Sequence, residues 1–406
     1  MSRNLIYSTI SAGSAVLLLL LATLIAHALG QDGFGQFSFA LSVAMIGEPL
    51  MDFGIHQITI RSIARDRSVA PHLFRNSIAL KAVPAVLMFL VLGAFVFAWE
   101  PGHDLRVACL LMLGSAVLRS YVLTVRGVLQ GLERFPEDSA IVIADRVLLL
   151  IAGAAALKLG AGLIGLALAF VIARTVALIG AVLVVRPHVG SPVPAFDTST
   201  WWDLQRRAVP LGAFLIALNV YSYVDTIILH HLTSDIETGL YNSAYRIYEG
   251  LSYAPAIISS VLTPRLSNLW KVDRHAHRRL LRTGLGASLA LAVLFTAVIW
   301  LLAPLALRIF PDAQPAILAL RILGLGLGFV FVIWILHALA ISVFQESRLF
   351  QTTMVGLIAN VALNFWLIPR YGRNGAAAAT VAAEALTMCV LWMFLRRALR
   401  PAAATI

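Results

Sequence analysis

The chain has 406 residues, of which 60% are hydrophobic and 13% are charged, and its mean hydropathy is +0.87. Soluble domains are about half apolar and about a quarter charged, so this composition excludes a chain of soluble domains and predicts an integral membrane protein. The net charge of +11 would suit a nucleic acid, but no soluble basic segment carries it. Cys109 and Cys389 lie in apolar runs, which give no sign of a disulfide framework or a metal cluster.

The apolar runs predict an all-α protein with about twelve membrane-spanning helices, because crossing a bilayer takes roughly 20 helical residues and open strands cannot span lipid. The first run imitates a signal peptide, but its full spanning length indicates a helix that is retained. The predicted spans are 5–29, 36–60, 78–99, 105–127, 138–158, 162–186, 208–232, 239–264, 283–308, 317–344, 349–368 and 375–396.

The basic residues are distributed unevenly between the predicted connections. Most of the 31 Lys and Arg residues fall in connections that share one side of the membrane, above all after the second and eighth spans. Cytoplasmic loops carry an excess of Lys and Arg, so this pattern predicts that both termini are cytoplasmic. The net positive charge then faces the anionic inner leaflet, and no nucleic-acid partner is expected.

The two halves of the chain share a weak internal repeat. The first two spans align without a gap on the seventh and eighth, which matches Gly35 with Gly239 and Arg61 with Arg265. Six spans per half is an even number, so both halves enter the membrane from the same side and are parallel repeats. We predict two six-helix lobes around a central cavity, residues 1–186 and 207–406, joined by a Pro-rich cytoplasmic linker at residues 187–206.

Charged residues inside the predicted spans are the candidate site residues. A charge at the centre of a membrane helix costs about 2.5–3.5 kcal/mol on insertion scales, so each should face a wet cavity or a partner. Arginine suits phosphate, because its planar guanidinium donates bidentate hydrogen bonds and stays charged. We expect the cations to bind substrate and the acids to couple an ion or gate the cavity. The cations are Arg119, Arg146, Arg174, Arg246 and Arg321, and the acids are Glu48, Asp52, Asp225, Glu249 and Glu384.

Several of these residues have a structural alternative. Arg246 and Glu249 are three residues apart, and a simple pair on one helix face explains them equally well. Asp225 and Arg246 lie at matching depths, which leaves an interhelical ion pair and a proton site equally open. The segment 47–49, Gly-Glu-Pro, predicts a break in the second span that serves either packing or gating.

Three stretches resemble the Wzx-type polysaccharide flippases of the multidrug/oligosaccharidyl-lipid/polysaccharide superfamily. They are 29–66 with its Gly-Phe-Gly segment, 207–269 with Tyr-x-x-x-Asp and Gly-x-Tyr-x-x-Ala-x-Arg, and 359–384 with Asn-x-x-x-Asn. The resemblance implies export of a polyprenyl-pyrophosphate-linked oligosaccharide from the cytoplasmic to the periplasmic leaflet of the bacterial inner membrane, for polysaccharide biosynthesis. It matches Asp225 and Arg246 to motif residues of the family.

The expected protein is therefore an alternating-access flippase with no enzyme activity, no cofactor and no metal site. Its expected partners are the lipid-linked oligosaccharide, membrane lipids, H⁺ or Na⁺ as a coupling ion, and a polysaccharide polymerase with glycosyltransferases. Two other functions stay open. One is a multidrug or other small-molecule exporter of the same superfamily, which an arginine-rich cavity disfavours. The other is a membrane polymerase or glycosyltransferase, which the short outer connections disfavour.

Overall fold

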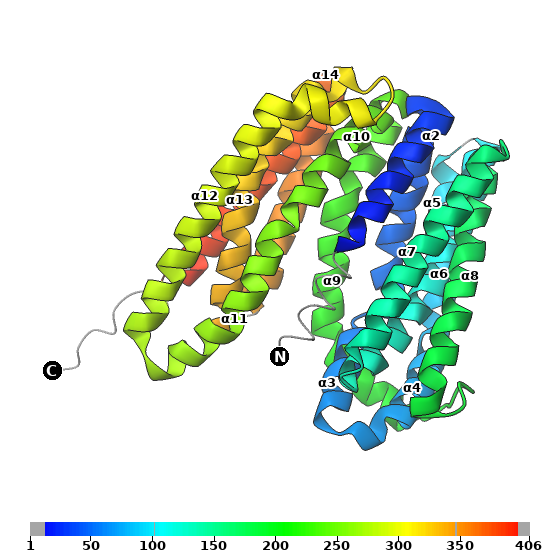
Figure 1. Ribbon diagram of the computed structural model, residues 1–406, viewed down its shortest axis with the longest axis vertical. Helices are drawn as coiled ribbons and strands as arrows, with labels where there is room; N and C mark the ends of the chain where they lie inside the picture. The colour runs from blue at the N-terminus through cyan, green and yellow to red at the C-terminus, as the bar shows by residue number, and fades with distance from the viewer. Residues whose placement is uncertain (1–12, 101, 346, 397–406) are drawn as a thin grey trace. The chain divides into compact units, whose positions relative to one another are not determined.

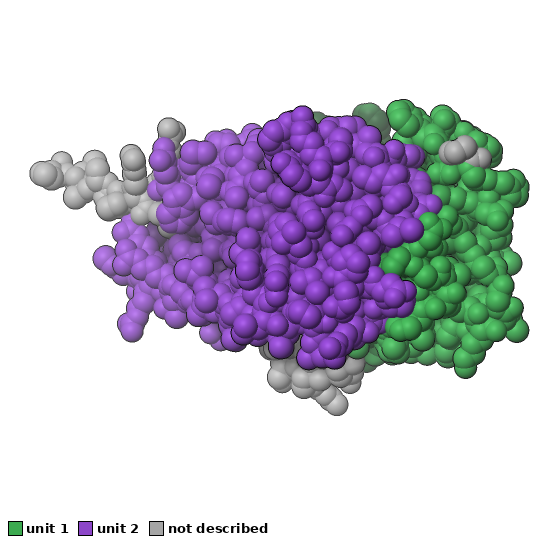
Figure 2. Space-filling model, turned by 90° about the horizontal axis from the view of Figure 1, so that it is seen from above, with its two compact units in different colours: residues 1–223 green, residues 224–406 purple. Residues whose placement is uncertain are grey.

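The computed structural model describes residues 13–100, 102–345 and 347–396, and the regular structure in this part of the chain is helical, with no strand (Figure 1). The first residues of the first predicted span, 5–12, lie outside it, as do both termini. The chain divides into two compact units, residues 1–223 and 224–406 (Figure 2). The boundary falls inside a helix, so the lobes predicted at 1–186 and 207–406 stay a prediction.

Unit 1 contains the first helices of the chain and most of the ninth. In this unit α6 and α8 pack against each other, α2 and α7 pack against both, and α3 and α4 lie at one end of the bundle (Figure 1). The elements are α2 (Ala15–Asp52), α3 (Ile55–Arg65), η1 (Arg67–Val69), α4 (Ala70–Leu80), α5 (Ala82–Trp99), α6 (His103–Gly131), α7 (Phe135–Lys158), α8 (Gly162–Val189) and α9 (Thr198–Leu232).

Unit 2 contains the end of α9 and the remaining helices. In this unit α13 packs against α10, α11, α12 and α14, and half of its residues are buried. The elements are α10 (Asp235–Ser252), α11 (Ala254–Val272), α12 (Arg274–Ala306), η2 (Leu307–Ile309), η3 (Gln314–Ala316), α13 (Ile317–Ser342) and α14 (Ser347–Leu395).

Local chemistry explains where the long helices bend and where α10 begins. Gly30 inside α2 and Gly372 inside α14 take positive φ values of 68° and 54°, a conformation that glycine adopts without a steric penalty. Ser234 precedes α10 and accepts a hydrogen bond from the Glu237 amide at 3.2 Å, a cap for the orphan N–H groups of the first turn. The bends at Gly30 and Gly372 each fall between two of the predicted spans.

Nine stretches of the described residues are long and apolar enough to cross a membrane. Two of them, in α2 and α14, contain the glycine bends and correspond to two predicted spans each, and α10 with α11 corresponds to the predicted span 239–264. The prediction of an all-helical multi-pass membrane protein with about twelve spans is confirmed. Large apolar side chains on α5 and α12, such as Leu90 and Leu301, are exposed, as expected where helices face lipid.

One end of unit 1 is held together by a hydrophobic core. Ile55 and Ile63 of α3, Phe74 of α4 and Val185 of α8 are buried in it together with Ala208 of α9. Burying one such large side chain contributes about 1.5–3 kcal/mol. The core fixes α3, α4 and the first turns of α9 next to one another.

Candidate functional site

Unit 1 contains a cavity of about 90 Å³ between α2, α6, α7 and α8. Four arginines line it: Arg119 and Arg126 of α6, Arg146 of α7 and Arg174 of α8. Three of these are predicted substrate-binding cations, which the structure brings together. Arg126 was missed, because its position at the end of a predicted span assigned it to a cytoplasmic connection.

Acidic side chains hold most of these guanidinium groups in place. Glu48 pairs with Arg119 at 3.0 Å, and Asp145 pairs with Arg174. Asp138 accepts a hydrogen bond of 2.7 Å from Arg126. Arg146 donates to the hydroxyl of Ser14 at 2.5 Å. The residues that line the cavity include four arginines and one acid, Asp145, so positive charge predominates in its wall.

A second charged cluster in unit 1 lies where α2 ends. Lys81 is fully buried and pairs with Asp52 at 2.5 Å, and its ammonium also donates to the Ser120 carbonyl and hydroxyl at 2.9 and 3.2 Å. The His56 amide donates to the other Asp52 oxygen at 3.3 Å. Asp52, a predicted coupling or gating residue, is therefore one partner of a buried ion pair. Lys81 was missed because the sequence pattern counted it among the cytoplasmic cations.

The break in the second span is not where the sequence predicted it. Helix α2 continues through Pro49 to Asp52, and the chain turns at Phe53 and Gly54, whose φ values are 46° and 81°. A proline removes one backbone hydrogen bond, which a membrane helix tolerates when neighbouring groups compensate. The prediction of a break at residues 47–49 is therefore wrong, and Gly54 makes the turn that proline does not.

In unit 2, Asp225 of α9 is the centre of a buried polar cluster. Its carboxylate accepts hydrogen bonds from the Tyr241 hydroxyl at 3.1 Å, the Thr380 hydroxyl at 2.6 Å and the Asn364 amide at 2.5 Å. Asn364 also donates to the Asn360 carbonyl oxygen at 3.1 Å. All the donors to Asp225 are neutral, so its charge has no countercharge in direct contact within this cluster.

The same cluster leaves some polar atoms without a partner. Within the described part of the chain, the carbonyl oxygen of Asn364 is buried and forms no hydrogen bond. Glu384 lies one turn beyond Thr380 on α14. Its Oε2 atom is also buried without a hydrogen bond, whereas its Oε1 atom accepts a hydrogen bond from the Tyr248 hydroxyl. Buried polar groups are nearly always satisfied, so these two oxygens are candidate ligands for a small cation. Sequence reasoning predicted Asp225 and Glu384 but gave no role to the two asparagines.

Asp225 and Arg246 were predicted to lie at the same depth in the membrane, where they could form an ion pair. This ion pair does not form. Among the described residues no cation lies within ion-pair distance of Asp225, and Arg246 pairs with Glu249 at 2.8 Å. Arg321, the remaining predicted cation, donates to the Trp300 carbonyl at 3.2 Å and lies against the Trp300 ring. Arg246 and Arg321 are both in unit 2 and belong to neither the arginine cavity of unit 1 nor the Asp225 cluster.

The chain is similar in sequence to two protein families and one curated protein. Residues 1–270 match the family model described as polysaccharide biosynthesis protein, and residues 210–369 match the MatE model. An uncharacterized membrane protein of Methanocaldococcus jannaschii is 22% identical over 385 residues, which cover 88% of both chains.

Solved structures with a similar fold cover nearly the whole chain. An inward-facing multidrug resistance MATE family transporter of the MOP superfamily has a TM-score of 0.77 at 14% identity, covering 95% of this chain and 94% of that one. The lipid II flippase MurJ, in an inward closed conformation, has a TM-score of 0.75 at 14% identity, covering 96% and 87%. A MOP superfamily transporter from Pyrococcus furiosus has a TM-score of 0.69 at 14% identity, covering 98% and 95%.

Proposed function

We propose that this chain, which belongs to the family of polysaccharide biosynthesis proteins, flips a polyprenyl-pyrophosphate-linked oligosaccharide across the membrane by alternating access. The chain is a multi-pass membrane protein with the fold of MOP superfamily transporters and flippases, and the solved structures that share this fold are transporters rather than enzymes. The proposed direction is from the cytoplasmic to the periplasmic leaflet of a bacterial inner membrane. In the same proposal both termini of the chain are cytoplasmic. Its partners are a polysaccharide polymerase and glycosyltransferases.

The arginine cavity of unit 1 is the observation that carries this proposal. Its guanidinium groups come from three helices, and the positive charge that predominates in its wall favours an anion that remains charged in the membrane. A diphosphate group is such an anion, and the planar arginine fork matches its oxygens. A neutral or cationic substrate would leave this positive charge uncompensated at a considerable free-energy cost.

Flipping by the purified protein in liposomes tests this proposal. Proteoliposomes are loaded with a fluorescent polyprenyl-diphosphate oligosaccharide, and a membrane-impermeant quencher reports which leaflet holds the label. We expect the wild-type protein to move the label and Arg146→Ala to slow its initial rate by about tenfold or more, since a hydrogen bond to a charged group contributes about 1.5–3 kcal/mol. Arg146 is suitable for this test because its hydrogen bond to the Ser14 hydroxyl is made to a neutral group, so the loss of that bond does not involve a carboxylate.

Arg279→Ala is the matched control, because Arg279 is an exposed arginine on α12, outside both clusters. It should flip the lipid at the wild-type rate. If the wild-type protein does not move the label, or if Arg146→Ala and Arg279→Ala are equally active, the cavity does not bind the diphosphate.

The Asp225 cluster supports a coupling-ion site for this transport. The oxygens of Asp225, Asn360, Asn364 and Thr380 are the hard donors that Na⁺ prefers, and a buried carboxylate can alternatively carry a proton. For Na⁺ coupling, Thr380→Val should raise the Na⁺ concentration for half-maximal transport, because it removes an oxygen. For H⁺ coupling, transport by the same variant should be independent of Na⁺. Unimpaired coupled transport by Asp225→Asn would exclude both.

A small-molecule exporter is the second candidate, favoured by the MatE match over residues 210–369. The acidic cluster of unit 2 would suit an organic cation, whereas the arginine cavity of unit 1 would repel it. Cells expressing the protein should then survive higher concentrations of cationic drugs, and liposomes should not flip the oligosaccharide. Drug resistance without lipid flipping would therefore replace the first proposal by the second.

A further inference from the structure

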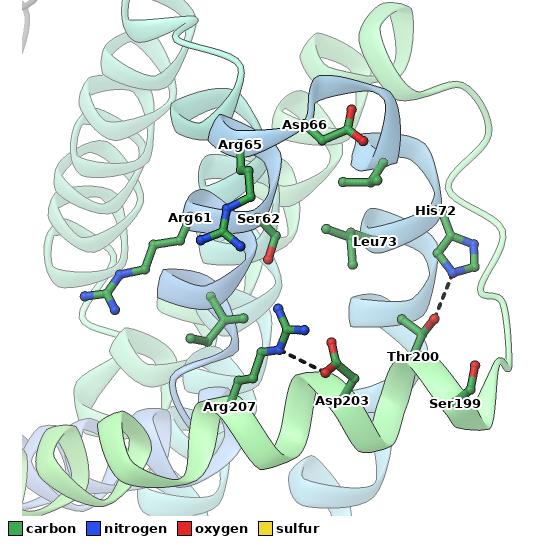
Figure 3. A pocket seen from close by; sticks show the side chains of 12 residues that line it. Arg61, Ser62, Arg65, Asp66, His72, Leu73, Ser199, Thr200, Asp203 and Arg207 are labelled. Carbon is green, nitrogen blue, oxygen red and sulfur yellow. Dashed lines mark hydrogen bonds and ion pairs between the residues drawn. The ribbon is translucent and has the colours of Figure 1, made fainter.

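A pocket of about 500 Å³ lies at the end of unit 1, between α3, η1, α4 and the first turns of α9 (Figure 3). It shares none of its lining residues with the arginine cavity described above. The buried side chains of Ile58 and Leu73 form part of its wall, and both belong to the hydrophobic core that fixes these elements. The pocket is therefore part of a stable frame.

Three arginines line the pocket from two sides. Arg61 and Arg65 are one turn apart on α3, and Arg207 comes from α9; Figure 3 shows Arg65 and Arg207 both extending into the space between these helices. Arg207 is paired with Asp203 at 2.9 Å. Neither Arg61 nor Arg65 forms a hydrogen bond or ion pair with another residue that the structure describes. The Arg65 guanidinium, which extends into this space, thus remains available for a ligand, whereas Figure 3 shows the Arg61 guanidinium pointing away from it.

The acidic and hydroxyl groups of the pocket are compatible with an anion. Asp66 accepts hydrogen bonds from the Ser68 hydroxyl and amide at 2.7 and 2.9 Å, which lower the pKa of Asp66, and Figure 3 shows its carboxylate turned away from the arginines. Ser62 also lines the pocket, and a hydroxyl of this kind is a good donor to phosphate oxygens, whereas the Ser199 hydroxyl already donates to Asp197 at 2.7 Å. The charge in the space between α3 and α9 is therefore dominated by arginine.

The surroundings of the pocket are those of a membrane surface. The apolar stretch of α9 that can span the membrane begins at Leu211, after the α9 residues of the pocket, and Val69, His72 and Leu73 of its wall lie at the start of the stretch 67–99. Trp202 and Phe196, which are 72% and 75% exposed, stand on α9 and on the segment before it. Exposed aromatic side chains beside a span are typical of the headgroup level of a bilayer.

We propose that this pocket binds a phosphate group at the membrane surface, with Arg65 and Arg207 as its cationic ligands and Arg61 as a further positive charge at its edge. The phosphate belongs to an anionic phospholipid headgroup or is free in solution, and the exposed aromatic residues favour the lipid. The pocket would then anchor this end of unit 1 to anionic lipid. This role is independent of transport, so it stands or falls separately from the proposed function.

Titration of the purified full-length protein in detergent tests the site. The probes are short-chain phosphatidylglycerol, short-chain phosphatidylcholine as the zwitterionic counterpart, and inorganic phosphate. We expect phosphatidylglycerol to bind more tightly than phosphatidylcholine, and Arg61→Ala/Arg65→Ala to weaken its binding by about tenfold or more, since charge-assisted hydrogen bonds are lost. Displacement of phosphatidylglycerol by inorganic phosphate identifies a site for the phosphate alone. A lack of displacement identifies a site for the lipid.

Two further variants make the test specific. Arg279→Ala/Arg282→Ala removes the same charge from exposed positions of α12 and should bind phosphatidylglycerol like the wild-type protein. Asp203→Asn removes the partner of Arg207 and should tighten binding by about two- to fivefold, the value of an exposed ion pair. This opposite effect keeps the test valid if Arg61→Ala/Arg65→Ala fails to fold. Equal binding by the wild-type protein and the pocket variants, equal loss in the α12 variant, or no binding of phosphatidylglycerol overturns the proposal.

Discussion

The buried ion pair between Lys81 and Asp52 makes a sharp prediction about unit 1. Replacing Lys81 by Met removes the cation but keeps an unbranched side chain of similar length. Asp52 would then retain the His56 amide at 3.3 Å, while its Oδ1 atom accepts no hydrogen bond from the other residues described. A buried carboxylate without its countercharge is strongly unfavourable, so Lys81→Met should destabilise the protein severely.

The size of the effect follows from the burial of both side chains. Lys81 is 0% exposed and Asp52 is 8% exposed, and removing one partner of such a pair costs about 3–5 kcal/mol. For a unit of residues 1–223, each kcal/mol corresponds to roughly 2–4 °C, so the midpoint of thermal unfolding should fall by about 6–20 °C. Lys158→Met is the control, because Lys158 is exposed at the end of α7, and it should change stability by about 0.5 kcal/mol or less.

Thermal unfolding of the purified protein in detergent, followed by tryptophan fluorescence, measures this effect. A double-mutant cycle with Asp52→Asn isolates the pair: Lys81→Met/Asp52→Asn removes both charges and should recover about 1–3 kcal/mol relative to the sum of the single changes. Equal stability of Lys81→Met and Lys158→Met would refute the reasoning. Strict additivity in the double variant would do the same, because uncoupled residues do not form a stabilising pair.

Three further changes should have measurable effects on the same unfolding midpoint. Gly54→Ala should cost about 1–3 kcal/mol, because the left-handed backbone at φ 81° is strained for alanine and the new methyl group would lie 3.0 Å from the α9 backbone. Gly160→Ala has a similar φ of 66° but no atom within 4 Å, so it should cost less. Tyr248→Phe should cost about 1–3 kcal/mol, since Glu384 loses its hydrogen-bond donor, whereas retained stability would show that Glu384 has another partner. Ser234→Ala removes the cap of α10 and should cost about 1 kcal/mol, and an unchanged midpoint would show that the cap contributes nothing.

The membrane spans could be predicted because composition and length report directly on burial in lipid. The glycines that bend α2 and α14, Gly30 and Gly372, also fall where separate spans were predicted, since each interrupts a run too long for one crossing. The turn at Gly54 could not be located, because the proline five residues earlier is the stronger sequence signal for a break. Whether a membrane helix tolerates a proline depends on neighbours that the sequence does not reveal.

Pairing between charged residues was harder to predict than their presence in the membrane. The sequence places Asp225 and Arg246 at the same depth in the membrane. It does not show in which direction each side chain points around its helix. In the structure Asp225 is held by Tyr241 and by groups on α14, while Arg246 pairs along its own helix. For Lys81 the prediction failed in the opposite way. The excess of Lys and Arg in cytoplasmic loops placed it at the membrane surface, whereas it is buried and paired with Asp52.

The two units differ in the chemistry of their buried polar groups, and this difference supports separate roles. The cations of the unit 1 cavity are arginines, which stay charged at any physiological pH and therefore suit a permanent anion. The carboxylate of Asp225 is held by hydroxyl and amide groups, which can reorganise around Na⁺ or a proton without breaking an ion pair. Arg146→Ala should therefore weaken the response to the proposed diphosphate substrate and leave the dependence on the proposed coupling ion unchanged. Asp225→Asn should do the opposite, and a variant of either residue that altered both properties equally would contradict this division.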